Sequence, residues 1–587
     1  MIDILKRTSK KERGIAAISV VFIIVQVWLE LKIPDYMSEI TTLLQTEGTT
    51  TQEIIHPGIW MIGLSLLSFL ASIVVGFFAA KIAASLSTRL RDQIYSKIMH
   101  FSQSEIQQFS IPSLITRTTN DLTQIQLVVA MGLQVVIKGP ITAVWAITKI
   151  ANKNWQWTLT TAIAVLFLLI MLSTLLLLVQ PKFTKVQNLT DKLNSITREN
   201  LSGIRVIRAY NAENIQSQKF EQANEILTTV NLFTNRMLAI MNPGMTIISS
   251  GLTLAVYWIG AYLIDAAQLD AKLVLFSDMV VFTSYAMQVV LGFMLMTIIF
   301  LILPRALVSA KRITEVLETN LSLVWPEQSV LTEKRGEIEF DHVSFGYDKS
   351  AVPVIQDISF KAKQGQTIAF IGSTGSGKST LINLIPRFYD ATSGGVKVDG
   401  QNVQAYAQDE LNNRIGFIPQ KPVLFSGTIR SNLDFGTSVG SPLSDNDLKQ
   451  ALTIAQAWDF VEAKSQKLDD PVAQGGSNFS GGQKQRLAIA RVIARKPEIL
   501  IFDDSFSALD YRTDKMLRDA LDTHLRQTTK LIVAQRISTI MHADQIIVLD
   551  EGRMVGIGTH ETLLATNDIY QEIAHSQLSK EELAHGK

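Results

Sequence analysis

Long stretches without a charged residue recur through the first half of the chain. A helix needs about 20 apolar residues to cross a bilayer. Four stretches reach this length without Asp, Glu, Lys or Arg, and they lie between Glu53 and Lys81, Lys153 and Lys182, Arg236 and Asp265, and Asp278 and Arg305. Two other runs are less clean: Gly14 to Leu29 stops at Glu30, and Leu127 to Ile150 contains two lysines. The pattern predicts six membrane-spanning helices.

The charges between these runs predict an orientation. Basic residues gather in Lys6 to Arg13, between Lys182 and Arg236, and after Arg305, whereas Asp35 to Pro57 has acids and no Lys or Arg. Since basic loops tend to stay in the cytoplasm, both termini are predicted to be cytoplasmic. The first run could also be a cleaved signal peptide, but no small-residue cleavage site follows it, which favours a retained span.

The second half of the chain has a different pattern. Short apolar runs, Gly-rich turns and amphipathic segments alternate there, which is typical of an α/β domain. Residues 309–340 resemble a helix that gives way to a polar connection. We therefore expect a transmembrane domain over residues 1–320, a linker over 321–335 and a second domain over 336–587.

Composition agrees with a membrane protein and excludes several kinds of site. Of 587 residues, 47% are hydrophobic and 18% are charged, which is too apolar for an ordinary soluble chain. The formal net charge of +1 gives no field that would attract nucleic acid. Cysteine is absent, which excludes disulfides, thiolate metal sites and cysteine nucleophiles.

A phosphate-binding loop stands between an apolar strand and a helix start. Its pattern is G-x-x-x-x-G-K-S, and its glycines let backbone N–H groups wrap phosphate oxygens. The lysine would reach the outer phosphates, and the serine hydroxyl can bind Mg²⁺. The residues of this loop predicted to bind a nucleoside triphosphate are Gly372, Ser373, Thr374, Gly375, Ser376, Gly377, Lys378, Ser379 and Thr380.

A second helix N-terminus able to bind phosphate follows in the same domain. Ser480, Gly482 and Gln483 open this helix after a glycine turn, and helix N-termini attract anions. One nucleotide does not need both sites from one copy, so we expect two copies to face each other and complete each other's sites.

These motifs, in this order and spacing, resemble the ABC transporters. Residues 336–575 resemble their nucleotide-binding domain, and residues 14–318 resemble the six-helix membrane half of the type IV exporters. The resemblance implies an all-α six-helix transmembrane domain followed by an α/β P-loop ATPase domain with a helical signature subdomain. It implies ATP and Mg²⁺ as cofactors.

The resemblance also assigns roles to single residues. Tyr347 would stack on adenine, and Gln420 would touch Mg²⁺ and sense the membrane domain; the plain alternatives are a core tyrosine and a surface amide. Asp503, at the end of an apolar strand, would hold Mg²⁺ together with Ser379 and Gln420. Residues 507–510, S-A-L-D, resemble the loop between the two sites.

Two positions depart from the family pattern. Where the family has a glutamate that orients the attacking water, the chain has Asp504, and where it has a histidine, the chain has Gln535. The shorter base would retreat by ~1.5 Å, and a misplacement of ~1 Å can cost ~100-fold in rate. Losing a positioned donor can cost a similar factor. The departures therefore predict a site that binds ATP and hydrolyses it slowly.

The functional prediction combines these points. The chain would be the degenerate-site half of a heterodimeric bacterial multidrug exporter in the plasma membrane, exporting amphipathic drugs or lipids. Ser480, Gly482 and Gln483 would complete a competent site on a partner that carries the glutamate and the histidine. Two alternatives remain: a homodimer in which Asp504 works adequately, and a regulatory subunit that senses nucleotide.

The membrane half offers further candidates. Residues 109–126 and 202–220 resemble the segments around short coupling helices that press into nucleotide domains. Met279, Phe282 and Tyr285 of the sixth run would suit either a cargo pocket or plain packing between helices. Lys138 lies inside a span, where an ionisable group is usually functional or reaches for an interface. Asp278 is expected close to the start of the last membrane helix.

Overall fold

The computed structural model describes residues 2–46, 48–151, 153–330, 332–347, 352–436 and 443–577. The chain divides into two compact units, one of Met1–Met99 with Pro112–Thr319 and the other of His100–Ile111 with Asn320–Lys587. The first unit is helical, and the second combines helices with sheets. Residues 100–111, which we had expected in the membrane domain, group with the second unit.

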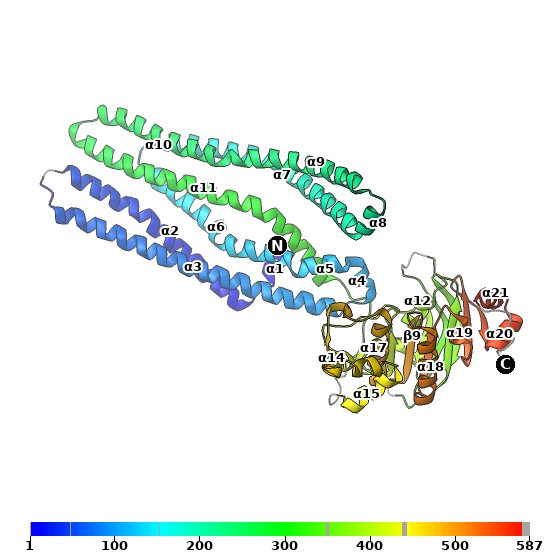
Figure 1. Cartoon of the computed structure of the whole chain (residues 1–587). Coiled ribbons are helices and arrows are strands. Elements are labelled where there is room, and N and C mark those ends of the chain that lie inside the picture. Colours follow the sequence, from blue (N-terminus) through cyan, green and yellow to red (C-terminus); the bar gives the residue numbers. More distant parts are fainter. Residues whose placement is uncertain are drawn as a thin grey trace. The chain divides into compact units, whose positions relative to one another are not determined.

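Long helices build the first unit (Figure 1). The described helices of this unit, long and short, are α1 (Ile2–Lys6), α2 (Lys10–Gln45), α3 (Thr51–Met99), α5 (Ile111–Thr118), α6 (Asn120–Ala151), α7 (Trp155–Ser202), α8 (Ile204–Ala209), α9 (Glu213–Ala239), α10 (Met241–Asp265) and α11 (Leu269–Glu318). In the described residues, 6 helical stretches are long and apolar enough to cross a membrane. The six predicted spans are confirmed, including the two less clean runs in α2 and α6.

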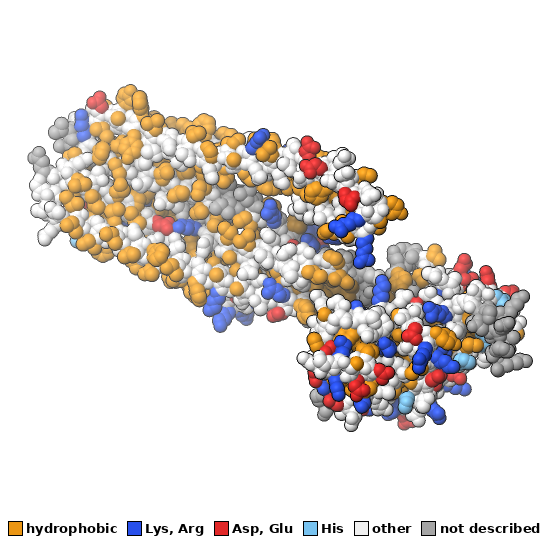
Figure 2. All heavy atoms as spheres, in the orientation of Figure 1, with side chains coloured by type: hydrophobic (Ala, Val, Ile, Leu, Met, Phe, Trp, Pro, Cys, Tyr) orange, Lys and Arg blue, Asp and Glu red, His pale blue; other side chains and the backbone are white. Residues whose placement is uncertain are grey.

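The helices run far beyond the apolar stretches. In α2 the helix continues past Glu30 and Asp35, because each carboxylate has a lysine partner on α6: Lys138 and Lys149 donate to them at 2.8 and 2.9 Å. Many large apolar side chains stay exposed on the helices, as the orange surface in Figure 2 shows. Such a surface suits lipid contact rather than water.

The start of the last membrane helix was predicted wrongly. α11 begins at Leu269, so Asp278 lies more than two turns inside it. The carboxylate is accommodated there by Lys153, whose Nζ lies 2.5 Å away. Met279, Phe282 and Tyr285 are buried inside the unit, so the packing alternative holds for these three.

The second unit holds two larger sheets. Their strands are β1 (Ile338–Phe345), β2 (Ile355–Ala362), β3 (Thr367–Gly372), β4 (Ser393–Val398), β5 (Gln401–Asn402), β6 (Ile415–Ile418), β9 (Ile499–Asp503), β10 (Thr529–Val533), β11 (Gln545–Asp550) and β12 (Arg553–Gly558). One sheet has the order β2-β1-β4-β5, and the other has the order β12-β11-β3-β10-β9-β6. A third, two-stranded sheet pairs β7 (Gly427–Thr428) with β8 (Pro471–Val472).

Helices complete the second unit. They are α4 (Gln103–Phe109), α12 (Lys378–Asn383), α13 (Gln408–Arg414), α14 (Ile429–Leu433), α15 (Asp445–Ile454), α16 (Trp458–Glu462), α17 (Gly481–Ala494), α18 (Tyr511–His524), α19 (Ile537–Ile540), α20 (His560–Thr566) and α21 (Asp568–Gln577). In the larger sheet β11, β3, β10, β9 and β6 are parallel. Because parallel strands end at one edge, the sheet brings the residues after β3, β9 and β10 together.

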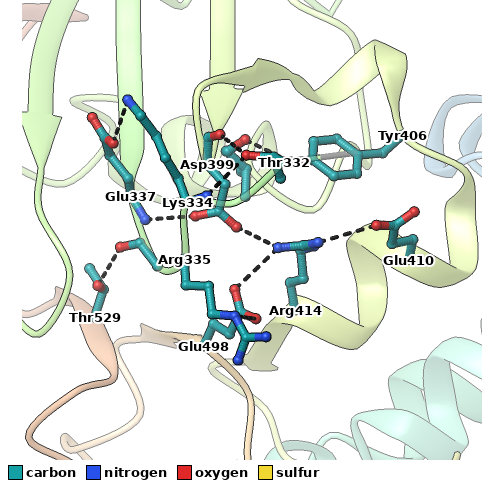
Figure 3. Close-up of polar contacts among 12 residues, drawn as sticks. Thr332, Lys334, Arg335, Glu337, Asp399, Tyr406, Glu410, Arg414, Glu498 and Thr529 are labelled. Carbon is teal, nitrogen blue, oxygen red and sulfur yellow. Dashed lines mark hydrogen bonds and ion pairs between the residues drawn. The ribbon is translucent and has the colours of Figure 1, made fainter. Parts of the chain in front are cut away.

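A polar network fixes residues 332–337, which lead into β1 (Figure 3). Asp399, whose side chain is fully enclosed, accepts from the Glu337 N–H at 2.9 Å and from Arg414 at 2.8 Å. Arg414 also pairs with Glu410 and Glu498 at 3.2 and 3.3 Å. The pKa of Glu498 is raised by burial, which Arg414 partly offsets. An enclosed charge with several partners, as here, fixes a segment in place.

Candidate functional site

The phosphate loop connects the end of β3 to the first turn of α12. At Gly372 a side chain is excluded, since an added Cβ would meet the Leu549 carbonyl oxygen at 1.9 Å. Lys378 folds back over the loop, and its Nζ donates to the carbonyls of Gly372 and Ser373 at 2.9 and 2.7 Å. Burial lowers the pKa of Lys378. Phosphate oxygens could replace these carbonyls without the lysine leaving the loop.

Two oxygens at the edge of the loop fit a Mg²⁺ ion. Ser379 Oγ donates to Asp503 Oδ1 at 2.7 Å. Neighbouring oxygens in an octahedral Mg²⁺ shell lie about 2.9 Å apart, given metal distances of ~2.0–2.1 Å. Burial also raises the pKa of Asp503, an effect that a bound cation would reverse. The donor set therefore fits the ion predicted from the sequence.

Asp504 is held by two glutamine side chains. Gln420 Nε2 and Gln535 Nε2 both donate to Asp504 Oδ2, at 3.1 and 2.9 Å. Burial raises the pKa of Asp504, and the bond from Gln420 opposes that rise. The backbone at Asp504 is left-handed, with φ 49°. The sheet thus brings three predicted site residues together. Asp504 and Gln535 are the two positions that depart from the family pattern, and Gln420 is a predicted Mg²⁺ ligand.

The predicted adenine-stacking residue touches the phosphate-loop helix. Tyr347 is half exposed, and its hydroxyl lies 2.9 Å from Thr380 Oγ1. Its ring meets that of Tyr389 edge to face at 5.3 Å. On α4, Gln107 Nε2 donates to the Tyr389 hydroxyl at 3.3 Å. A chain of three contacts, Gln107–Tyr389, Tyr389–Tyr347 and Tyr347–Thr380, therefore connects α4 with the phosphate-loop helix α12. Helix α4 adjoins the predicted coupling segment of residues 109–126.

The second helix N-terminus is closed by its own residues. Ser480 is the N-cap of α17: its Oγ accepts from the Gln483 N–H, while Gln483 Oε1 accepts from the Ser480 N–H at 3.0 Å. In the part of the chain that the structure describes, no hydrogen bond or ion pair joins Ser480, Gly482 or Gln483 to the phosphate loop. The two phosphate-binding elements do not meet through such contacts in one chain.

Sequence reasoning missed Gln577, the last residue of α21. Its Nε2 donates to the Gln535 carbonyl at 2.7 Å, and its Oε1 accepts from the Ile537 N–H at 2.8 Å. One side chain thus holds the backbone on both sides of Arg536, directly after the strand that positions Gln535. An exposed glutamine in an amphipathic helix carries no sequence signal for this role. Gln107, exposed on α4, was missed for the same reason, whereas Tyr389 is buried, and a buried aromatic residue reads as core packing in sequence.

Comparison with known families agrees with this arrangement. Residues 16–294 match the ABC transporter transmembrane region, and residues 355–507 match the ABC transporter family model. The fold resembles a solved bacterial Atm1-family ABC exporter with ATP bound, with a TM-score of 0.80, 21% identity and coverage of 97% of this chain and 99% of that chain. The chain belongs to the ABC transporters, as a half-transporter of the exporter type.

Relatives in other organisms match over nearly the whole length. An uncharacterized ABC transporter ATP-binding protein of Mycobacterium tuberculosis is 37% identical, over 98% of this chain and 98% of the relative. A multidrug resistance ABC transporter ATP-binding and permease protein of Lactococcus lactis is 30% identical, over 88% and 86%. An ATP-dependent lipid A-core flippase of Saccharophagus degradans is 29% identical, over 92% and 89%.

Proposed function

We propose that the chain exports amphipathic molecules as one half of a heterodimeric ABC exporter, and that the site at its own phosphate loop binds ATP but turns it over slowly. Lys378 and the loop amides would hold the phosphates, and Tyr347 the adenine. Ser379, Asp503 and Gln420 would hold Mg²⁺, which neutralises phosphate charge when bound.

The arrangement around Asp504 is the observation that carries this proposal. In the family, a glutamate positions water and a histidine contacts the terminal phosphate. Here the shorter carboxylate accepts two amide N–H groups on one oxygen, and these donors oppose the rise in the pKa of Asp504 that burial causes. One of the two N–H donors of Gln535 is bonded to Asp504, which holds the amide toward that carboxylate. Both departures, Asp504 in place of glutamate and Gln535 in place of histidine, are expected to slow hydrolysis.

The N-terminus of α17 supports a role for this chain in the nucleotide site of a facing subunit. Ser480 and Gln483 satisfy each other at the start of α17, which leaves the helix dipole and the Gly482 backbone to meet a nucleotide from outside the chain. We propose that Ser480, Gly482 and Gln483 complete the competent site of a partner half-transporter. That partner would carry the glutamate and the histidine that this chain lacks.

The proposed cargo rests on the names of two relatives, and the proposed orientation in the membrane rests on the distribution of basic residues. Relatives named for multidrug resistance and for lipid A-core flipping support amphipathic cargo for this chain too. The basic N-terminus and basic internal loops support cytoplasmic termini. We place the protein in a bacterial plasma membrane, with the ATPase domain on the cytoplasmic side.

The test compares the ATPase rate of the purified chain with that of the same chain assembled with its partner. The chain alone should hydrolyse ATP slowly while binding it tightly. The assembled pair should turn over rapidly, and Ser480→Arg in this chain should abolish that rate, because it blocks the site completed from this side. Family-normal turnover by the chain alone would favour the homodimer and overturn the proposal.

A sensor that binds ATP without transport is separated by a second measurement. Vesicles that carry the assembled pair should accumulate a fluorescent amphiphile when ATP is supplied. ATP binding without uptake, in a pair whose ATPase is active, would identify a regulatory subunit instead.

A further inference from the structure

An ion pair lies deep inside the membrane helices. Lys138 on α6 donates to Glu30 Oε1 on α2 at 2.8 Å. The same oxygen accepts from Gln26 Nε2 at 3.0 Å and from Ser68 Oγ on α3 at 3.3 Å. Three helices therefore converge on one carboxylate oxygen.

The depth of this pair follows from α3. Ser68 stands close to the middle of the uncharged run between Glu53 and Lys81. At ~1.5 Å per residue, about 20 Å of helix separates it from either charge. Because the hydrocarbon core is about 30 Å thick, Ser68 and the carboxylate that it touches lie near the bilayer midplane. Charged groups at this depth are costly and usually mark a functional site.

The pair is open and incompletely bonded. The side chains of Lys138 and Glu30 are 24% and 23% exposed. Among the described residues, Glu30 Oε2 accepts no hydrogen bond, and Lys138 donates only to Glu30. An ammonium has three N–H donors, so two donors and one carboxylate oxygen remain available side by side.

The backbone behind Lys138 is fixed by a close helix crossing. An added Cβ on Gly139 would lie 3.0 Å from the Gly292 carbonyl oxygen on α11, and one on Gly292 would lie 2.9 Å from the Gly139 carbonyl oxygen. The two helices approach through glycine, as small residues allow in membranes. Lys138 thus projects from a rigid position.

An open apolar hollow lies along α6 on the C-terminal side of Lys138. It has a volume of about 430 Å³ and is lined by Pro140, Ile141, Val144, Trp145 and Thr148. Ile141 and Trp145 follow Lys138 by three and seven residues, so they share its helix face. A charged pair at one end of an apolar hollow matches an amphiphile with its headgroup at the pair and its chain along the helix.

We propose that Glu30 and Lys138 form a headgroup site for a zwitterionic amphiphile. The ammonium of the ligand binds Glu30 Oε2, its phosphate binds the free N–H donors of Lys138, and its acyl chain lies over Ile141 and Trp145. A ligand with both charges keeps the site neutral, which a simple cation or anion would not. The inference rests on the proposed export of amphipathic molecules and names their charge class.

The test measures binding to the purified full-length chain in a nonionic maltoside detergent. The probes carry the same fluorescent acyl chain on four headgroups: lysophosphatidylethanolamine, lysophosphatidylglycerol, an acyl amine and an uncharged monoacylglycerol. The wild-type chain should bind the zwitterion most tightly. In the double variant Glu30→Gln/Lys138→Met, the affinity for the zwitterion should fall by at least about 10-fold, while the affinity for the uncharged probe should not change.

Single variants and a matched pair sharpen the result. Lys138→Met should shift the preference toward the cationic probe, and Glu30→Gln toward the anionic probe. The control is Asp35→Asn/Lys149→Met, which removes another ion pair between the same two helices and should leave the headgroup preference unchanged.

The outcomes are distinct. An unchanged ratio of zwitterion to uncharged affinity in the folded double variant, checked by its thermal transition, would overturn the headgroup site. So would a wild-type preference for the cationic or the anionic probe. ATP-driven uptake with no headgroup preference would remove this inference alone, whereas headgroup binding without uptake by the assembled pair would remove the proposed export.

Discussion

The two halves of the nucleotide site are held in different ways. In the phosphate-loop half, Lys378 bonds to backbone carbonyls and Ser379 bonds to Asp503, and phosphate and Mg²⁺ can take over each of these contacts. In the other half, Asp504 is fixed by Gln420 and Gln535, and neither amide can act as a base. The comparison predicts that binding and hydrolysis can be altered separately within one pocket, since different side chains supply them even though Asp503 and Asp504 are neighbours at the end of β9.

The largest effect should come from the phosphate-loop half. Lys378→Met removes the cation that we expect to contact the outer phosphates, so ATP affinity should fall by roughly 100-fold, since a hydrogen bond to a charged group contributes ~1.5–3 kcal/mol. Equilibrium binding of a fluorescent ATP analogue measures this. Lys363→Met is the control, because this exposed lysine precedes the start of β3, at the other end of the strand. Equal affinities in both variants would mean that the loop does not bind the nucleotide.

The next effect should come from the Asp504 half and have the opposite sign. The double change Asp504→Glu/Gln535→His should raise the ATPase rate at this chain's own phosphate loop by about 10–100-fold, since it restores a longer base and a donor to phosphate. The rate is measured in the assembled pair, because the site needs a facing subunit. ATP affinity should change little. Asp504→Asn should lower the residual rate instead. If the double variant is no faster than the unchanged chain, the two departures do not limit hydrolysis.

Much of this comparison could be predicted from sequence, because the relevant residues sit at strand ends. The apolar strands before Gly372, Asp503 and Gln535 are continuous runs, and parallel strands bring their ends to one edge. The six spans followed from length and charge alone. The start of α11 could not be predicted in this way, because Asp278 lies inside the helix, where it is paired with Lys153.

Other parts had no local signal. Gln577 acts through backbone groups that only the fold brings near it, and any glutamine on an exposed helix face looks the same in sequence. The same holds for Gln107, and the buried Tyr389 looks like a core residue in sequence. Glu30 marked the end of an apolar run, and only the packing of α2 on α6 showed that Lys138 lies beside it.

A smaller effect should follow from the support behind Gln535. Gln577→Ala removes both bonds to the backbone around Arg536, so Gln535 should lose its fixed position next to Asp504. We expect the turnover of the otherwise repaired chain to fall by about 3–10-fold, with ATP affinity unchanged, since a small displacement near the reacting atoms has a large effect on rate.

Two variants control this measurement. Gln571→Ala is the matched one, because that glutamine lies on the same helix but bonds to the Leu564 carbonyl; it should have little effect. Gln577→Asn, one methylene shorter, should recover part of the rate. A loss of ATP affinity in step with turnover would show a general weakening of the domain rather than a role in positioning.

The smallest effect should be a dependence on pH that reaches only the Asp504 half. His560 opens α20, and its Nδ1 lies 2.7 Å from the hydroxyl of Tyr570 on α21. Burial lowers the pKa of His560 from its usual 6.5. Because the folded pKa is the lower one, the unfolded chain takes up the proton first. The packing of α20 on α21 is therefore fully stable above pH 6.5 and weakens as the pH falls from there through the folded value.

Because α21 carries Gln577, acid should loosen the support of Gln535 before it affects the phosphate loop. Between pH 7.5 and 5.5, the thermal transition should fall by a few °C, and turnover of the repaired chain should fall while ATP affinity holds. His560→Gln cannot titrate, so it should flatten both changes. If ATP affinity fell in parallel with turnover, or if His560→Gln kept the full pH dependence, the two halves of the site would not be separable in this way.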